Sequence, residues 1–254
     1  MHLFESLLVA LSTYSALPVP QFEWNERNMR YAICFFPAVG VVCGGALWAW
    51  YALAETLQIG SVLFAAVAAC LPLLLTGGIH LDGYMDTVDA LASHQSRERK
   101  LEIMKDPHCG AFAVIYCAVY LLLYFGLIHE LYGIRQIPVL CPAFVLSRTL
   151  SGLCAVSLPN ARKAGMLNAY TQDADKRISA AVLGAAMVVS AAVTIWLSPA
   201  AGTGSVSLAL LCALLYRRMA MRQFGGVTGD TAGFFLQTCE LSCLLGAWIG
   251  GVFG

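Results

Sequence analysis

Residues 110–128 read GAFAVIYCAVYLLLYFGLI and contain no charged side chain. A helix needs about 20 mostly apolar residues to cross the hydrocarbon core of a bilayer, so this stretch predicts a membrane-spanning helix. Other long apolar stretches also predict membrane-spanning helices. They cover residues 31–54, 56–81, 136–161 (charged only at Arg148), 178–216 and 231–254 (charged only at Glu240).

The number of spans follows from the lengths of these stretches. Residues 178–216 are too long for one span, and Ser198-Pro199 together with Gly202-Thr203-Gly204 divide them in two. We therefore predict an all-α, polytopic integral membrane bundle of about seven spans, forming a single domain over residues 1–254. Its sixth span, near residues 206–216, is the shortest.

The N-terminal segment 1–20 is apolar but contains His2, Glu5 and several hydroxyl side chains. It has no basic start and no small-residue cleavage site, so it does not resemble a signal peptide. We expect an interfacial or half-inserted helix here.

The composition excludes several classes of protein. The chain is 59% hydrophobic and only 12% charged, with a mean hydropathy of +0.72, whereas a soluble domain has about 25% charged residues. With 15 Lys+Arg against 15 Asp+Glu, nothing indicates a nucleic-acid partner. The ten cysteines form no CxxC pair, so we interpret them as small hydrophobic residues rather than as a disulfide framework.

The basic residues predict the orientation. Four segments, 22–30, 82–106, 162–177 and 217–230, hold thirteen Lys/Arg. The alternate connections 55–60, 129–135 and 198–205 hold only Arg135. Because cytoplasmic loops are enriched in Lys and Arg, we expect the first set to face the cytoplasm. The protein is thus predicted to lie in the plasma (inner) membrane, in contact with lipid, with catalytic loops near 80–110, 162–177 and 217–233 inside the cell.

An acidic cluster is the main functional signal. Residues 82–106 hold ten of the thirty charged residues. Asp82, Asp86 and Asp89 are spaced i, i+4, i+7, which puts them on one face of a helix. Carboxylates this close repel each other unless a cation lies among them, and Mg²⁺ is usually held by one or two carboxylates plus substrate phosphates. The alternative is a solvated polar helix start with Asp82 as its cap.

Basic side chains follow the acidic cluster. Arg97, Arg99 and Lys105 are candidate phosphate ligands, since Arg matches phosphate oxygens with two parallel donors; alone, they would be a lipid-facing basic loop. Glu102 and Asp106 form a second acidic pair. This pair predicts either further metal ligands or salt bridges with Arg99 and Lys105.

Two distant features complete the predicted site. Arg148 lies inside a span, where a cation is costly, and it needs either Glu240 or a bound anion; phosphate binding is the favoured interpretation. A glycine-rich turn over residues 225–233 can approach a ligand closely and cradle phosphate, and Thr228 or Asp230 can cap the last helix. His80, His94 and His108 lack the spacing of a zinc site. Together these residues predict Mg²⁺-dependent transfer of a phosphate-containing group.

Residues 76–89, TGGIHLDGYMDTVD, resemble the signature of the adenosylcobinamide-GDP ribazoletransferase family, also called cobalamin-5′-phosphate synthase. The resemblance extends over nearly the full chain. Further matching motifs are residues 6–20, Arg97-x-Arg99, residues 101–106 with Gly110, Ser147-Arg148, Ala161-Arg162 with Gly165, and residues 225–233. The sequence departs from the family at Ala90, Pro107 and Gln237; the last change favours Glu240 as the acid that matters in that region.

The resemblance implies a reaction and a set of roles. A ribose hydroxyl of α-ribazole or its 5′-phosphate attacks adenosylcobinamide-GDP, GMP leaves, and Mg²⁺ assists. Asp82 and Asp86 are assigned to metal, and Asp89 to metal or general base. Further metal ligands are expected at Glu102 and Asp106. The substrate and phosphate contacts are assigned to His80, Arg97, Arg99, Lys105, Arg148, Arg162, Thr228, Gly229 and Asp230.

Two other function classes remain as alternatives. A CDP-alcohol phosphotransferase also has spaced aspartates, but its Ala-Arg after the Asp-Gly is replaced here by Tyr84-Met85. A cation or vitamin transporter could use Asp82 and Asp86 as an ion site, yet the chain shows no evident internal repeat of the kind that many transporters have. The sequence allows a homo-oligomer without indicating one.

Overall fold

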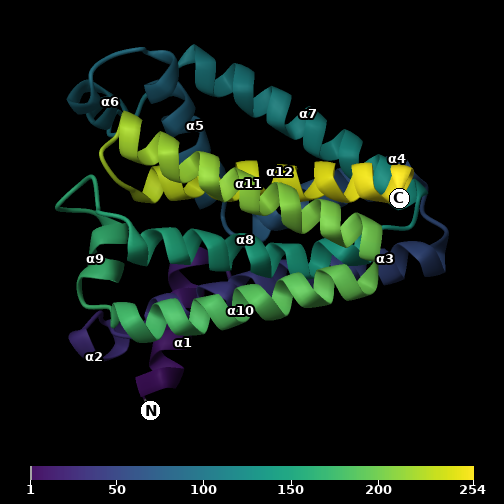
Figure 1. Ribbon diagram of the computed structural model, residues 1–254, viewed down its shortest axis with the longest axis horizontal. Coiled ribbons are helices and arrows are strands. Elements are labelled where there is room, and N and C mark those ends of the chain that lie inside the picture. The colour runs from purple at the N-terminus through teal and green to yellow at the C-terminus, as the bar shows by residue number, and fades with distance from the viewer. Residues whose placement is uncertain (1) are drawn as a thin grey trace.

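The computed structural model describes residues 2–254, and over this range it is built of helices without a β-strand. Six helices are long and apolar enough to cross a membrane, and they run side by side along the long axis of the molecule (Figure 1). They are α3 (Phe36–Leu57), α7 (Ala111–Gly133), α8 (Ile137–Ser157), α10 (Lys176–Leu197), α11 (Pro199–Gln223) and α12 (Gly229–Phe253). The predicted all-α membrane bundle is confirmed.

One predicted span is broken. The stretch 56–81 forms α4 (Ser61–Leu75), and α5 (Ile79–Ala92) then turns away from it by 91°. Gly77 and Gly78 have φ angles of +62° and +76°, a left-handed conformation that glycine adopts without steric cost. The pair counts as a seventh crossing only if both helices are taken together. We describe α5 as lying outside the crossing helices, because it does not continue the direction of α4.

The division of residues 178–216 also differs from the prediction. Ser198 ends α10 and Pro199 begins α11, as expected, but Gly202-Thr203-Gly204 lies inside α11. A Cβ on Gly204 would lie 2.1 Å from the carbonyl oxygen of Gly246 in α12. These glycines therefore allow close helix packing rather than a turn, and the short sixth span is a full-length helix of 25 residues.

The remaining helices are shorter; the first three precede α3 and the other two lie between later helices. They are α1 (His2–Tyr14), α2 (Glu26–Met29), the 3₁₀ helix η1 (Ala32–Phe35), α6 (Arg97–Ile103) and α9 (Met166–Gln172). With 13 residues, α1 is too short to cross a bilayer. It occupies most of the expected N-terminal segment 1–20, of which residue 1 lies outside the described residues.

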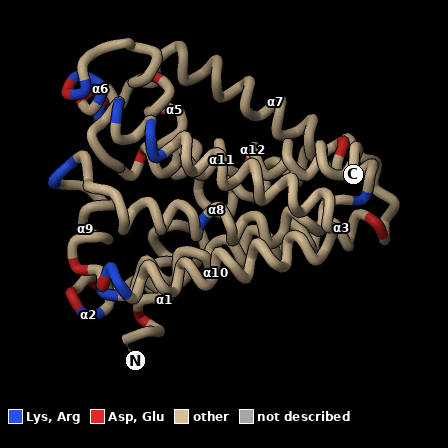
Figure 2. Tube along the Cα trace, in the orientation of Figure 1, with Lys and Arg blue, Asp and Glu red and all other residues tan. Residues whose placement is uncertain are grey.

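Charged residues gather at one end of the bundle, which we call the basic end (Figure 2). All Lys and Arg except Arg135 and Arg148 belong to segments at this end. Arg135 lies at the opposite end, where its neighbours Ile134 and Gln136 lie against Gly251, close to the C-terminus of the chain.

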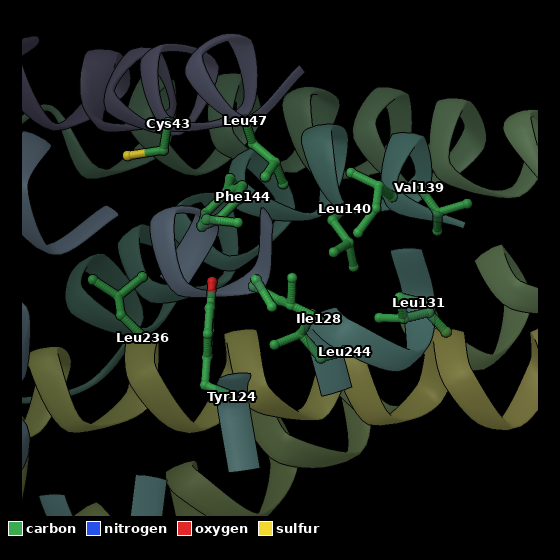
Figure 3. Close-up of a cluster of buried hydrophobic side chains, with 14 of the residues drawn as sticks. Cys43, Leu47, Tyr124, Ile128, Leu131, Val139, Leu140, Phe144, Leu236 and Leu244 are labelled. Atoms are coloured by element: carbon green, nitrogen blue, oxygen red, sulfur yellow. The ribbon is translucent and has the colours of Figure 1, made fainter. Parts of the chain in front are cut away.

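Apolar side chains fill the middle of the bundle. Figure 3 shows Tyr124 of α7 pointing toward Phe144 of α8, with Leu47 of α3 and Leu244 of α12 packed nearby. Many large apolar side chains on the outside are exposed, among them Trp196. Such a surface suits contact with lipid rather than water.

One ion pair lies inside this apolar region. Arg148 of α8 and Glu240 of α12 form a salt bridge, with 1% and 4% of their side chains exposed. The same guanidinium nitrogen donates to the hydroxyl of Ser147 at 3.0 Å. Because the guanidinium is enclosed by protein and already paired with a carboxylate, phosphate binding, which we favoured from the sequence, is not the arrangement found for Arg148.

We predict that Arg148→Met destabilises the protein by about 3–5 kcal/mol, because it leaves the Glu240 carboxylate buried without its partner. Adding Glu240→Gln should restore most of this loss, because removal of both charges of a buried pair is often close to neutral. Thermal unfolding of both single variants and the double variant in detergent measures the effect. A single Arg148→Met variant that is as stable as the wild type would contradict the structural role.

Candidate active site

A cavity of about 360 Å³ opens at the basic end. Its walls come from α1, the start of α3, α5, the end of α8, the connection 160–168 and the start of α12. Six residues predicted from the sequence as site residues line it. They are His80, Asp82, Arg162, Thr228, Gly229 and Asp230.

Close packing between α5 and α12 brings two of the motifs together. A Cβ on Gly83 would lie 2.8 Å from the carbonyl oxygen of Asp230, and one on Gly233 would lie 2.8 Å from that of His80. Real Cβ atoms essentially never come this close, so both positions need glycine. The aspartate motif and the glycine-rich turn therefore meet through backbone contact.

A second contact positions Arg162. The backbone N–H of Val227 donates to Pro159 at 2.9 Å, and that of Ala161 donates to Val227 at 2.9 Å. Arg162 then donates to the carboxylate of Asp230 at 2.9 Å and to the carbonyl of Leu101 at 2.9 Å. This guanidinium lies at the cavity with its Nε without a partner.

Thr228 determines where α12 begins. Its hydroxyl accepts a hydrogen bond from the N–H of Thr231 at 3.1 Å, and the Thr231 hydroxyl accepts one from the N–H of Thr228 at 2.8 Å. This reciprocal cap fixes the first turn. Of the two caps considered from the sequence, Thr228 is the one present. The positive end of the α12 dipole thus faces the cavity, where it favours anions.

The three aspartates of α5 lie in different surroundings. Asp82 is exposed at the cavity and Asp86 is half-buried on the next turn. Burial, followed by the nearby carboxylates of Asp82, Asp230 and Asp89, raises the pKa of Asp86 to about 6. A cation placed among these groups would relieve the repulsion.

The fit of Mg²⁺ to these residues follows from its coordination chemistry. Among residues 2–254, no three His, Cys, Asp or Glu side chains already form a metal cage. Mg²⁺ does not need one, because it keeps several waters and is usually held by one or two carboxylates plus substrate phosphates. Asp82 and Asp86 therefore fit a metal site that substrate completes.

Asp89 has a task that the sequence did not predict. Its two carboxylate oxygens accept hydrogen bonds from the backbone N–H groups of Gly110 at 2.7 Å and Ala113 at 2.9 Å. It thereby caps the first turn of α7 from a neighbouring helix. Each carboxylate oxygen keeps a second lone pair, so the role of Asp89 as metal ligand or general base stays a prediction beside this capping role.

The basic and acidic residues of α6 and the turn after it lie away from the cavity lining. Arg97 donates to the carbonyls of Met221 and Arg222, both at 3.3 Å, and so holds α6 against the end of α11. Arg99 pairs with Glu102 at 2.8 Å, which is the salt-bridge alternative considered from the sequence.

Two more candidates sit in the turn that follows α6. Asp106 accepts from the backbone and ring of His108, and these bonds lower its pKa. Lys105 is exposed. The structure therefore does not bring Glu102, Asp106, Arg97, Arg99 or Lys105 to the cavity wall, where the phosphate and second metal sites were expected.

Sequence reasoning missed part of the lining. Tyr14 and Phe36 form an aromatic wall, with ring centroids 4.6 Å apart. Asn160 donates to Asn168 at 3.0 Å and to Thr171 at 2.8 Å, while its buried Oδ1 lacks a partner. Tyr14 lies within the matching motif 6–20 and Asn160 directly precedes the Ala161-Arg162 motif, whereas Phe36 carried no sequence signal.

Comparison with known families agrees with this constellation. A family model described as cobalamin-5-phosphate synthase matches residues 6–248. The chain belongs to this family. The family resemblance inferred from the sequence, and with it the prediction of an enzyme, is confirmed.

Individual relatives support the same assignment. An adenosylcobinamide-GDP ribazoletransferase of Lachnoclostridium phytofermentans is 44% identical over 241 residues, covering 95% of this chain and 92% of the relative. One of Desulfitobacterium hafniense is 36% identical, covering 95% and 96%. One of Pseudomonas savastanoi pv. phaseolicola is 34% identical, covering 93% and 96%. No solved structure matches the chain.

The cap role of Asp89 gives a prediction that separates it from its two neighbours. Asp89→Ala should lower stability by about 1–2 kcal/mol, as the loss of a helix cap does, and should leave Mn²⁺ binding unchanged. Asp82→Ala is the matched control, since its exposed carboxylate caps no helix; it should keep stability and weaken Mn²⁺ binding. Thermal unfolding and electron paramagnetic resonance of Mn²⁺ measure both. Loss of Mn²⁺ binding by a fully stable Asp89→Ala protein would show that Asp89 is a metal ligand.

Proposed function

We propose that this protein joins adenosylcobinamide-GDP to α-ribazole or α-ribazole 5′-phosphate, releasing GMP and forming adenosylcobalamin or its 5′-phosphate. The observation that carries the proposal is the cavity at which Asp82, Arg162 and Asp230, from three separate family motifs, meet. The printed names of the relatives, which cover nearly the whole chain, support the choice of substrates.

The reaction is a substitution at phosphorus. The ribose hydroxyl oxygen forms a bond to the phosphorus that carries cobinamide, and the bond from that phosphorus to the oxygen of GMP breaks. GMP leaves with the electron pair. The hydroxyl proton passes to a carboxylate of α5, at an oxygen that the metal does not hold.

The side chains of the cavity supply binding and orientation. Arg162 is held in place by Asp230 and by the carbonyl of Leu101, so its guanidinium is oriented at the cavity before a diphosphate binds. The start of α12 adds backbone dipoles beside it. Preorganised positive groups of this kind stabilise the charge that develops in phosphoryl-type transfer.

Mg²⁺ is the metal we propose, held by Asp82 and Asp86 together with substrate phosphate. When bound, it neutralises phosphate charge and polarises the reacting phosphorus. We propose further that the protein lies in the plasma (inner) membrane with the basic end in the cytoplasm, because Lys and Arg gather at that end and cytoplasmic loops carry this excess.

Turnover should depend on the metal and on the two carboxylates. We expect no GMP release in EDTA, rescue by Mg²⁺ or Mn²⁺ but not by Zn²⁺ alone, and at least about a hundredfold loss of rate in Asp82→Asn and Asp86→Asn. The assay uses purified protein in detergent, adenosylcobinamide-GDP, α-ribazole 5′-phosphate and a metal titration. Near-wild-type rates in both variants would show that these carboxylates do not act in the reaction.

The orientation gives a separate prediction. Cysteines placed at Gln95 and Lys163, both exposed at the basic end, should resist a membrane-impermeant thiol reagent in intact cells. A cysteine at Thr56, exposed at the other end, should react. Labelling after cell lysis is the control for reactivity. Labelling of position 95 in intact cells would reverse the orientation and separate the site from cytoplasmic nucleotides.

A further inference from the structure

The lining of the cavity divides into a mostly apolar part and a polar part, which we call the floor and the mouth. The floor consists of residues that belong to, or directly precede, the crossing helices. They are Ile33, Phe36, Ala155 and Leu236, together with Ser151 and Gly152 of α8. The mouth is formed by groups from the ends and connections of helices, namely Asp82, Asn160, Arg162, Thr228 and Asp230. A ligand that fills this space is therefore apolar at one end and polar at the other.

Two aromatic rings, those of Tyr14 and His80, lie beside Phe36 of the floor. The rings of Tyr14 and His80 stack with centroids 6.2 Å apart, and Phe36 meets Tyr14 at 4.6 Å and His80 at 6.1 Å. Three aromatic rings from three different helices favour a flat aromatic ligand, which stacks on or meets the edges of such rings. His80 adds one polar feature, because its Nε2 is buried without a hydrogen-bond partner.

We propose that this cavity binds the nucleophile, the α-ribazole half, with its benzimidazole base on the aromatic floor and its ribose at the mouth. The proposal rests on the function proposed above. A volume of about 360 Å³ falls in the range of about 300–1,000 Å³ that holds small ligands. The corrinoid partner, which carries a tetrapyrrole-like macrocycle and its side chains, is far too large for it.

The polarity of the floor distinguishes between the two nucleosides of the reaction. Guanine carries hydrogen-bond donors and acceptors around its edge, and burying them against Phe36, Ala155 and Leu236 would leave them unpaired. A benzimidazole joined to ribose has a single free ring nitrogen. The Nε2 of His80, buried without a partner in the free protein, is the group that we assign to that nitrogen.

The position of Asp82 determines how the two substrates meet. Asp82 lines the cavity and also a shallow open groove that includes Gly77, Leu81 and Met85. With the base on the floor, the ribose hydroxyl lies at the mouth beside Asp82. The phosphorus of the second substrate reaches the same carboxylate from the open side.

Filling the floor tests the proposal. Ala155→Leu adds bulk to the cavity, whereas Ala185→Leu makes the same change on the exposed face of α10, away from the cavity. Binding of α-ribazole and of adenosylcobinamide-GDP to the full-length protein in detergent is measured separately by calorimetry. We expect Ala155→Leu to weaken α-ribazole binding at least tenfold with little change for adenosylcobinamide-GDP, and Ala185→Leu to change neither.

The opposite pattern overturns the proposal. If Ala155→Leu weakens adenosylcobinamide-GDP or GMP and spares α-ribazole, the cavity holds the nucleotide that leaves. If the wild type does not bind α-ribazole, the proposal also fails. GMP release by the wild type is a separate measurement, so an active enzyme with the wrong binding pattern disproves the assignment of the cavity and leaves the proposed function standing.

A photoreactive azidobenzimidazole riboside provides a test that does not depend on the folding of a variant. On the wild-type protein, we expect cross-linked peptides that contain Tyr14, Phe36 or His80, identified by mass spectrometry and suppressed by unlabelled α-ribazole. Cross-linking confined to residues 97–106 would place the base outside the cavity and contradict the proposal.

Discussion

The backbone contact between α5 and α12 is the constraint on which the rest of the site depends. Gly83 and Gly233 leave no room for a Cβ between the two helices. A methyl group at either position would force the backbones apart, and Asp82 and His80 would move away from Arg162 and the start of α12. In this protein the chemistry of the motifs is therefore inseparable from their packing: the glycines determine where the carboxylates and the guanidinium stand.

Sequence alone predicted the features that local chemistry determines. Charge-free stretches identify crossing helices because lipid offers no partner for a charge, and the spacing of Asp82, Asp86 and Asp89 correctly placed them on one helix. The sequence did not reveal contacts between residues that are far apart along the chain. Asp89 binds backbone groups 21 and 24 residues further along the chain, and the aromatic wall of Tyr14 and Phe36 comes from separate helices.

Glycines were the least predictable residues. Gly77 and Gly78 break a helix, while Gly202 and Gly204 let one helix pack closely against others. Glycine thus has two opposite effects on these helices, and only the position of the neighbouring backbone decides which effect a given glycine has. The Arg148–Glu240 pair shows a similar limit. The sequence offered two partners for the Arg148 guanidinium, the Glu240 carboxylate and a substrate phosphate. Which of them it meets depends on how deep Arg148 lies in the bundle.

The brevity of α4 has a consequence for the membrane itself. Its 15 residues span about 22 Å at 1.5 Å per residue, against about 30 Å of hydrocarbon. Val62, Leu63 and Leu74 are exposed along it, so lipid beside this helix has to thin, or the protein has to adjust to the mismatch. Any adjustment falls on the turn at residues 76–78, which leads directly into the carboxylates of α5. A change in bilayer thickness is therefore expected to act first on this turn and, through it, on the position of α5.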